Sequence, residues 1–389
     1  MARPVPKVPA CGLTMADVQC KFSHMTTVPR VEILLLNWKG WRDTIECLES
    51  LLALEYSNFG LIVCDNDSPD GSVEKIEAWA RGQLDVQSTF RGRVAEHARA
   101  RSRPLRSKAV DRAAAESGSV RGDVMDLLII RTGGNLGFSG GNNVGFRHLQ
   151  ARGDVDYVWM LNNDTVVAPD ALAHLVRCAE QGADIGAVGA TVLEFDHPDV
   201  VQYFAGASFA AWRGRIQLLG HGLPASAPRS IASRLDYISG GCMLVPMRVL
   251  DDVGLLDERF FMYSEDADWC LRMRDAGYRV VYAPEAEIWH KGGASSVPGS
   301  PMHDYHNMVG NLLVMEKHHP WRMPFTVIYC LYRYLAPKII RRQWTRAAAV
   351  ARAFRDVAFG RTGALAAHRP SAGPRTPSVL EPLVTADTP

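Results

Sequence analysis

Short apolar runs alternate with segments of helical periodicity through the first half of the chain. Four runs have the length and continuous apolar character of strands buried in a parallel sheet: residues 31–36, 59–64, 127–131 and 157–161. Between or after them, apolar side chains recur with helical spacing at residues 41–54, 72–79 and 169–181. The pattern predicts an α/β fold with a mostly parallel central sheet, right-handed crossovers and flanking helices.

Polar turns follow three of these strands. They read DNDSPDG at residues 65–71, GGNLGFSGGNN at 133–143 and NND at 162–164. Because ligands of such sheets bind at the carboxyl ends of the strands, which share one edge, the turns predict a single binding site. The glycine-rich turn has neither the ending of a Walker A loop nor the spacing of a dinucleotide fingerprint. We interpret its glycines as allowing the backbone to approach a nucleotide.

Residues 257–290 carry the most informative pattern of the chain. An aromatic run precedes the acidic pair Glu265 and Asp266, a helical pattern follows, and two short β-like runs then lead to His290. One carboxylate and one imidazole can hold a divalent cation, while a second carboxylate accepts a proton. Together with Asp164 of the NND turn, these residues are the parts that a metal-assisted displacement at a sugar nucleotide requires.

Each of these residues also has a structural interpretation. Asp164 is in a position to cap its own turn, a lone histidine such as His290 is more often structural, and acids at a helix start favour the helix dipole. Capping explains one acid well but not a pair beside an aromatic run. We therefore interpret Asp266 as the base and Glu265 as the residue that orients it, whereas Asp268 is interpreted as structural.

The character of the chain changes beyond residue 320. Residues 325–359 combine aromatic and aliphatic side chains with Lys and Arg in a basic amphipathic helical pattern that is interrupted at Pro337. Two interpretations stay open. The segment is a packed pair of C-terminal helices, or it is a helix at a membrane surface, because Trp, Tyr and Phe together with Arg are typical of interfaces.

Composition sets limits on function. The chain has 389 residues, of which 47% are hydrophobic, and its net charge of +1 supplies no field that would attract nucleic acid. Its eight cysteines show no paired spacing, no apolar run reaches the roughly 18 residues of a membrane span, and the N-terminus lacks a signal-peptide pattern. We therefore expect the protein in the cytoplasm, or peripheral on the inner face of the membrane.

The expected organisation is one large domain with flanking segments. These are a disordered tail at residues 1–29, the main domain at 30–320, an amphipathic helical region at 321–361 and a disordered tail at 362–389. Within the main domain, residues 91–125 are expected to form a basic insertion. Its Arg-rich part, 91–112, is interpreted as a solvated, mobile segment or, alternatively, as a contact with an anionic surface.

Together the motifs resemble those of the family-two inverting glycosyltransferases, in the branch of rhamnosyltransferases and galactofuranosyltransferases. The matching stretches are LLLNWKGWRDTIECLESL, LIVCDNDSPDGS, GGNLGFSGGNN, YVWMLNNDTVVAPDAL, ISGGCMLVP and GLLDERFFMYSEDADWCLRMRDAGYRVVYAPEAEIWHKGGASS. They follow the family order over residues 31–296. The resemblance implies a GT-A fold, in which a nucleotide-binding α/β half and a mixed acceptor half share one core.

The resemblance also implies roles for individual residues. Asp164 and His290 would bind Mg²⁺ or Mn²⁺, and Asp266 would be the catalytic base. The nucleotide sugar would lie against the side chains of Asn37, Asp65, Asn66, Asp67, Asn135, Asn162 and Asn163. The acceptor side would be formed by Trp269, Tyr263, Gly240 and Gly241. The chain departs from the family in the single acid of its NND turn, in the Arg-rich insertion and in the segment YHNMVGN at 305–311.

The implied reaction is an inverting transfer of a sugar, L-rhamnose from dTDP-L-rhamnose, to a hydroxyl of a glycan or lipid-linked glycan. Transfer from UDP-galactofuranose or another UDP-sugar is the alternative. The expected partners are the donor, the acceptor and an anionic membrane surface, but not nucleic acid.

Two other classes of protein remain to be weighed. A sugar nucleotidyltransferase would carry a glycine-rich loop with Arg and Lys after the first strand, where this chain has NWKG at residues 37–40. A non-catalytic binding protein on a decayed transferase fold would not need Glu265, Asp266 and His290.

Overall fold

The computed structural model describes residues 28–90, 103–120, 125–210, 215–230, 235–292 and 299–363. The two expected tails fall almost wholly outside these ranges, and so do residues 91–102 and 121–124 of the expected insertion. Disorder of the tails therefore stays a prediction.

The apolar runs form one large sheet. In the described part of the chain it has ten strands in the spatial order β3, β4, β2, β1, β5, β12, β7, β13 and β6, with β8 paired to β7. Their bounds are β1 Val31–Asn37, β2 Phe59–Asp65, β3 Ser107–Asp111, β4 Leu127–Arg131, β5 Tyr157–Asn162, β6 Thr165–Val167, β7 Ile185–Glu194, β8 Val201–Phe204, β12 Cys242–Pro246 and β13 Arg279–His290. Strands β3, β4, β2, β1 and β5 are parallel to one another, and β12 runs antiparallel between β5 and β7. The mostly parallel sheet predicted from the sequence is confirmed.

Helices flank this sheet, as predicted. Their bounds are α2 Trp41–Leu52, α3 Ser72–Ala80, α4 Arg112–Glu116, α5 Gly137–Arg152, α6 Ala171–Ala179, α7 Met247–Val253 and α8 Glu265–Asp275. All seven residues of β2 are buried, which explains why the strand reads as an unbroken apolar run. A smaller sheet is formed by β9 (Gly206–Ala210), β10 (Arg215–Leu218) and β11 (Tyr237–Ile238), with β9 between the other two strands.

Glycines bring α5 close to the sheet. A Cβ on Gly141 would lie 2.4 Å from Leu36 Cδ1, and one on Gly145 would lie 2.4 Å from Leu34 Cδ1. A side chain at either position would displace a leucine side chain of β1, so Gly141 and Gly145 allow close packing of the helix on the strand. This is a different reason for them from the approach to a nucleotide that the sequence suggested.

The expected insertion is partly structured. Residues 107–111 form the edge strand β3, which pairs in parallel with β4, and α4 follows directly. The expectation of a solvated, mobile segment was therefore wrong for this part. The cause is that β3 buries only Val110 among its five residues, and such an edge strand has no apolar pattern to distinguish it from coil.

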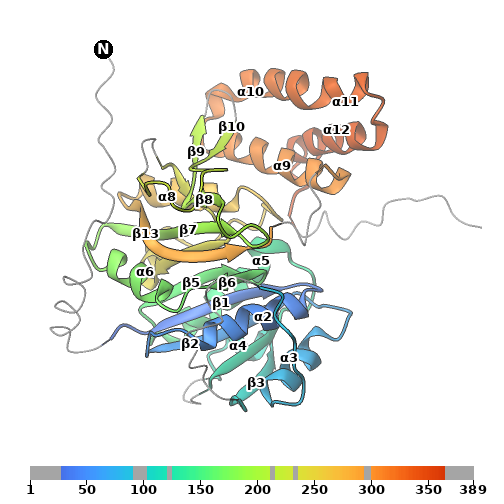
Figure 1. Ribbon diagram of the computed structural model, residues 1–389. Coiled ribbons are helices and arrows are strands. Elements are labelled where there is room, and N and C mark those ends of the chain that lie inside the picture. The colour runs from blue at the N-terminus through green and yellow to red at the C-terminus, as the bar shows by residue number, and fades with distance from the viewer. Residues whose placement is uncertain are drawn as a thin grey trace, which may run out of the picture.

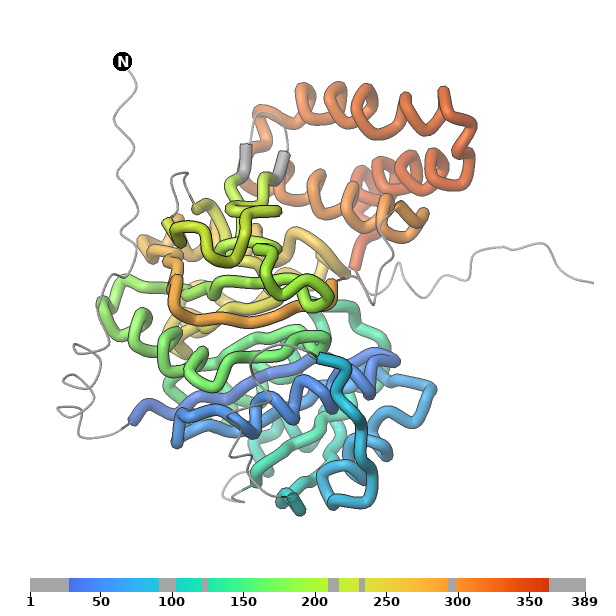
Figure 2. The backbone as a smooth tube through the Cα atoms, in the orientation of Figure 1, coloured from blue at the N-terminus to red at the C-terminus, as the bar shows by residue number. Residues whose placement is uncertain are grey.

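The C-terminal region forms a helical layer beyond one side of the sheet, on the side away from β3 and α3 (Figures 1 and 2). Its elements are α9 Pro301–His318, η2 Pro320–Arg322, α10 Met323–Cys330, η3 Leu331–Leu335, α11 Ala336–Ile340 and α12 Trp344–Ala358. Apolar side chains of α9 and α12, among them Leu312, Val350 and Ala353, share a buried cluster with Phe260. The interpretation as packed helices is thus confirmed for α12. Among the described helices, none combines the length and apolar character needed to cross a membrane.

Candidate active site

A cavity of about 900 Å³ opens where the carboxyl ends of the parallel strands meet. The ends coincide because Asn37 pairs with Asp65 and Leu36 pairs with Asn162 in the strand register. The cavity is lined by eleven of the residues that the sequence analysis identified. They are Asn66, Asn135, Asn162, Asn163, Asp164, Gly240, Gly241, Tyr263, Glu265, Asp266 and His290. The shared edge predicted from the three polar turns is therefore present.

Asn37 and Asp65 lie behind the cavity wall instead of in it. The Asn37 amide donates to Asp65 Oδ2 at 2.6 Å, and its oxygen accepts from Thr44 Oγ1 at 3.0 Å. Both side chains are almost fully buried, so they join the ends of β1 and β2. Asp67 is exposed at a left-handed φ of 62° and is not part of the wall either. A direct nucleotide contact for these three residues stays a prediction.

Trp269 lies in the core, which corrects its expected position on the acceptor side. Its side chain is fully buried, its indole N–H donates to Gly254 O at 2.8 Å, and its ring packs 5.4 Å from the ring of Phe146. The residue is one helical turn from Asp266, but it faces the sheet side of α8 and not the cavity.

The glycine-rich turn is joined to the loop before α8. Asn66 Nδ2 donates to Gly137 O at 2.9 Å, and Asn135 Oδ1 accepts from Gly137 N at 3.1 Å. Gly137 has a φ of 74°, and a Cβ on it would lie 2.3 Å from Phe261 O. Phe138 N donates to the same carbonyl at 2.7 Å. The glycine-rich turn and the segment that carries the acidic pair thus form one continuous wall.

Asp164 and His290 meet in the cavity wall. His290 Nε2 lies 3.1 Å from Asp164 Oδ1 and 3.1 Å from Asn162 Nδ2, while Nδ1 lies 2.8 Å from Gln202 Oε1. Because Gln202 Oε1 can only accept, Nδ1 carries a hydrogen, which leaves Nε2 as the ring atom that faces Asp164. Burial would raise the pKa of Asp164, but the charge and hydrogen bond of His290 hold it below the usual value.

This pair fits a divalent cation but does not complete its coordination. A lone pair and a carboxylate that face each other attract only through a cation or a proton between them. Within the described ranges, no group of three or more His, Cys, Asp or Glu side chains is arranged to hold a metal. A cation at this position would therefore need further oxygen ligands, such as those of a bound diphosphate.

Helix α8 begins directly after a strained turn. Tyr263 and Ser264 have φ values of 71° and 70°, in the left-handed region that non-glycine residues rarely adopt. Gly310 of α9 lies against this turn, and a Cβ there would be 2.5 Å from Tyr263 O. This contact gives a structural reason for the glycine in the segment YHNMVGN.

The acidic pair at the start of α8 has two different environments. Asp266 is partly exposed and faces the cavity, and its carboxylate accepts from Gly240 N at 3.0 Å and Ala267 N at 2.8 Å. Burial raises the pKa of Asp266, and these backbone hydrogen bonds oppose the shift. Glu265 is buried, and its Oε2 has no hydrogen-bond partner. Burial, followed by the charge of Asp266, raises the pKa of Glu265 well above its usual value.

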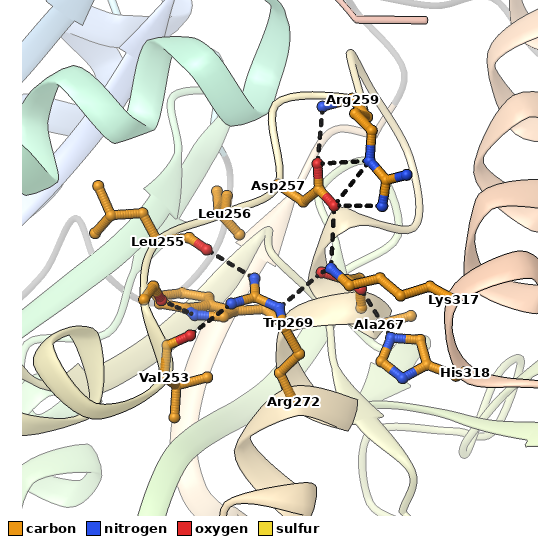
Figure 3. Close-up of polar contacts among 12 residues, drawn as sticks. Val253, Leu255, Leu256, Asp257, Arg259, Ala267, Trp269, Arg272, Lys317 and His318 are labelled. Carbon is orange, nitrogen blue, oxygen red and sulfur yellow. Dashed lines mark hydrogen bonds and ion pairs between the residues drawn. The ribbon is translucent and has the colours of Figure 1, made fainter. Parts of the chain in front are cut away.

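Ion pairs attach α8 to α9. The fully buried carboxylate of Asp268 lies 2.9 Å from Arg272 Nε, 2.9 Å from Lys317 Nζ and 2.8 Å from His318 Nε2. Lys317 also contacts Asp257 at 3.0 Å, and Figure 3 shows Lys317 and His318 reaching from α9 toward α8. Burial would raise the pKa of Asp268, but these partners lower it. The structural role predicted for this residue agrees with its contacts.

The C-terminal helices supply part of the wall that the sequence did not reveal. Tyr305 and His306 of α9 and Arg352 of α12 line the cavity. The His306 ring stacks on Phe261 at 5.0 Å, and burial together with the charge of Arg352 lowers the pKa of His306 to about 4. The sequence analysis also did not identify Gln202, which contacts His290. No local sequence signal marks these residues, because a single side chain on a strand or helix acquires its neighbours only in the fold.

Two family models match the chain. "Glycosyl transferase family 2" covers residues 37–106, and "Glycosyltransferase like family 2" covers residues 109–299. Together they cover most of the sheet, the cavity edge and the acidic pair, and the first match begins at the last residue of β1. The chain belongs to glycosyltransferase family 2. It is a glycosyltransferase, and its architecture is the GT-A fold that the resemblance implied.

Individual proteins similar to this glycosyltransferase include two rhamnosyltransferases. The N-acetylglucosaminyl-diphospho-decaprenol L-rhamnosyltransferase of Mycobacterium tuberculosis is 29% identical over 220 residues, which is 51% of this chain and 70% of that protein. The dTDP-rhamnosyl transferase RfbF of Shigella flexneri is 32% identical over 90 residues, 21% of this chain and 30% of that protein. A mannosyltransferase structure from Pyrobaculum calidifontis has a TM-score of 0.47 at 13% identity, covering 89% of this chain and 93% of that one.

The first prediction concerns the attachment of α8. Asp268→Asn removes the buried charge that the Arg272 and Lys317 cations share, so it should lower the free energy of unfolding by about 3 kcal/mol. Urea unfolding at pH 7 measures this. Asp275→Asn, on the exposed end of the same helix, is the matched control and should stay within about 0.5 kcal/mol of the unsubstituted protein. Equal effects of the two substitutions would contradict the account.

The same cluster predicts a dependence of stability on pH. Partners hold the pKa of Asp257 and Asp268 below the ordinary value of 3.8, so both groups stabilise the fold above that value. This stabilisation is lost as the pH falls through 3.8 toward the folded-state values. Unfolding measured from pH 6 down to pH 3 should therefore show a steeper loss of stability in the unsubstituted protein than in Asp268→Asn. Parallel curves would show that Asp268 is not ionised in the fold.

Proposed function

We propose that this glycosyltransferase moves L-rhamnose from dTDP-L-rhamnose to a hydroxyl of a glycan or lipid-linked glycan, with inversion at the anomeric carbon. The observation that carries the proposal is that the Asp266 carboxylate and the Asp164–His290 pair face one cavity beside the asparagine-rich strand ends. The names of the two rhamnosyltransferases support the sugar and the nucleotide. The first of them also supports a lipid diphosphate that carries N-acetylglucosamine as the acceptor.

The reaction is a single displacement. Asp266 accepts the proton of the acceptor hydroxyl, the freed oxygen forms a bond to the anomeric carbon, and the bond to the nucleoside diphosphate breaks with its electron pair. The attack comes from the face opposite the leaving group, which inverts the centre without a covalent enzyme intermediate. The amides of Gly240 and Ala267 hold the Asp266 carboxylate in place for this step.

The two acids divide the proton between them. Of the two acids, Glu265 is the one that we infer to hold a proton more tightly, because it is the more buried group and its carboxylate would lie beside that of Asp266. Asp266 remains ionised, because two backbone N–H groups stabilise its charge. A neutral Glu265 thus preserves the basicity of its neighbour without adding a second buried charge.

Asp164 and His290 would hold Mn²⁺ or Mg²⁺, with Gln202 fixing the tautomer of the histidine. When bound, such a cation supplies positive charge next to the departing diphosphate. Asn66 and Asn135 line the same cavity and are the candidate contacts of the nucleoside.

Substitution of each acid separates their roles. Asp266→Asn removes the base and should lower kcat by about 10²- to 10⁴-fold while leaving donor affinity nearly unchanged. Glu265→Gln is the matched control, because it replaces a protonated acid by a neutral side chain of the same shape, and it should retain most of the activity. Turnover is measured with dTDP-L-rhamnose and a short polyprenyl-diphospho-N-acetylglucosamine, and donor affinity by calorimetry.

If Glu265→Gln lowered kcat more than Asp266→Asn, the base would be Glu265. If Asp266→Asn weakened donor binding as much as turnover, Asp266 would be a donor contact and not the base.

Substitution of Gln202 tests the metal site without using activity. Gln202→Ala removes the acceptor that orients His290, and the affinity for Mn²⁺ in the presence of dTDP should fall by about 10- to 100-fold. Calorimetric titration with Mn²⁺ measures it. Gln217→Ala, exposed on β10, is the control and should bind Mn²⁺ normally. Unchanged affinity in Gln202→Ala would mean that His290 does not ligate the metal.

A further inference from the structure

Exposed apolar side chains concentrate on the C-terminal helices. Of the twelve large hydrophobic side chains that are exposed in the described part of the chain, nine lie between residues 321 and 359. Six of them define what we call the outer face: Trp321, Phe325, Ile328, Tyr332, Ile339 and Ile340. Phe325 is 67% exposed and Ile340 is 80% exposed. A monomeric soluble protein rarely leaves so many large apolar groups together in water.

Four of these residues follow one another at helical spacing through the consecutive elements η2, α10 and η3. Trp321, Phe325, Ile328 and Tyr332 are separated by four, three and four positions, the spacing of neighbours on a helix surface. Thr326 and Cys330, on the other side, are buried against the rest of the layer. The helix therefore buries one side in the protein and presents a second apolar side outward.

Positive charge surrounds the outer face. Between Glu316 and Asp356 the sequence has nine Lys or Arg residues and no Asp or Glu. Five of these nine pair with acids elsewhere, whereas no described acid pairs with the remaining four, which are Arg322, Arg333, Arg341 and Arg342. Arg322 lies over the Trp321 ring at 4.3 Å, so charge and apolar surface are interleaved.

We propose that the outer face binds the surface of an anionic lipid bilayer. Apolar side chains with interleaved arginines suit the boundary between lipid headgroups and acyl chains, where the rings and aliphatic groups enter the apolar region and the cations meet phosphate. No described helix combines the length and apolar character needed to cross a bilayer, so the proposed contact is with the bilayer surface. A second copy of the chain fits less well, because a two-fold contact would bring the four arginines of each copy together.

This binding would place the active-site cavity at the membrane. Met302 is exposed and lines the cavity, and the cavity-lining Thr345 directly follows the exposed Trp344. Helix α12 thus contributes to the cavity wall and continues into the surface next to the outer face. In Figure 1, α10 and α11 form the part of the helical layer farthest from the sheet. An acceptor embedded in the same bilayer would reach the cavity without leaving the membrane.

The test uses the full chain and vesicles, without donor or acceptor, so it is independent of the proposed reaction. Vesicles of phosphatidylglycerol and phosphatidylcholine should sediment the protein at low salt, and vesicles of phosphatidylcholine alone should sediment much less. The triple variant Trp321→Ser, Phe325→Ser, Ile328→Ser should lower the partition coefficient by at least about tenfold. Leu218→Ser with Leu223→Ser, which removes exposed apolar groups from another part of the surface, is the matched control and should bind normally.

A second variant tests the charge. Arg333→Gln with Arg341→Gln should weaken binding to the anionic vesicles by roughly fivefold for each charge removed and should reduce its dependence on salt. Thermal unfolding confirms that each variant is folded, which is expected because all substituted side chains are exposed. Absence of vesicle binding at low salt would overturn the proposal. So would equal binding of the triple variant, or conversion of a dimer to a monomer by that variant without an effect on vesicles.

Discussion

The burial of two adjacent carboxyl groups at the start of α8 is the constraint on which the rest of the site depends. Glu265 and Asp266 follow two residues in the left-handed region, and burial raises the pKa of both. Such an arrangement is unfavourable on its own, because a buried carboxyl oxygen without a hydrogen-bond partner and a strained backbone each destabilise a fold. It persists only if the surrounding structure holds α8 in place.

That support comes from segments far apart in the chain. Asp268 contacts Lys317 and His318 of α9. Gly310 of α9 leaves space for the strained turn, and the glycine-rich turn donates a hydrogen bond to the carbonyl of Phe261. The C-terminal helical layer is therefore part of the catalytic structure and not an appendage to it. One side of α12 is buried against α9, and a second side, with Ala349 and Arg352, lines the cavity, while α10 and α11 remain available for a surface contact.

Much of the fold and of the site was predictable, because its signals are local. Buried parallel strands read as apolar runs, and a carboxylate or histidine at a strand end or helix start can be placed at the shared edge from topology alone. Contacts that depend on side-chain direction were not predictable. Trp269 is near Asp266 in sequence but faces the core, and Gln202 gains its role only where β8 passes His290. The edge strand β3 was missed because it buries too little to leave an apolar pattern.

The most direct test of the account is whether the cavity binds a nucleotide sugar in a metal-dependent way. Thermal unfolding would be compared with dTDP-L-rhamnose, UDP-galactofuranose, UDP-glucose and GDP-mannose, each with and without Mn²⁺. A ligand present at a hundred times its Kd adds about 2.7 kcal/mol to the stability of the native state. The account predicts a rise of Tm with dTDP-L-rhamnose that needs Mn²⁺ and is abolished in Asp164→Ala. No rise with any donor, or an equal rise without the metal, would contradict it.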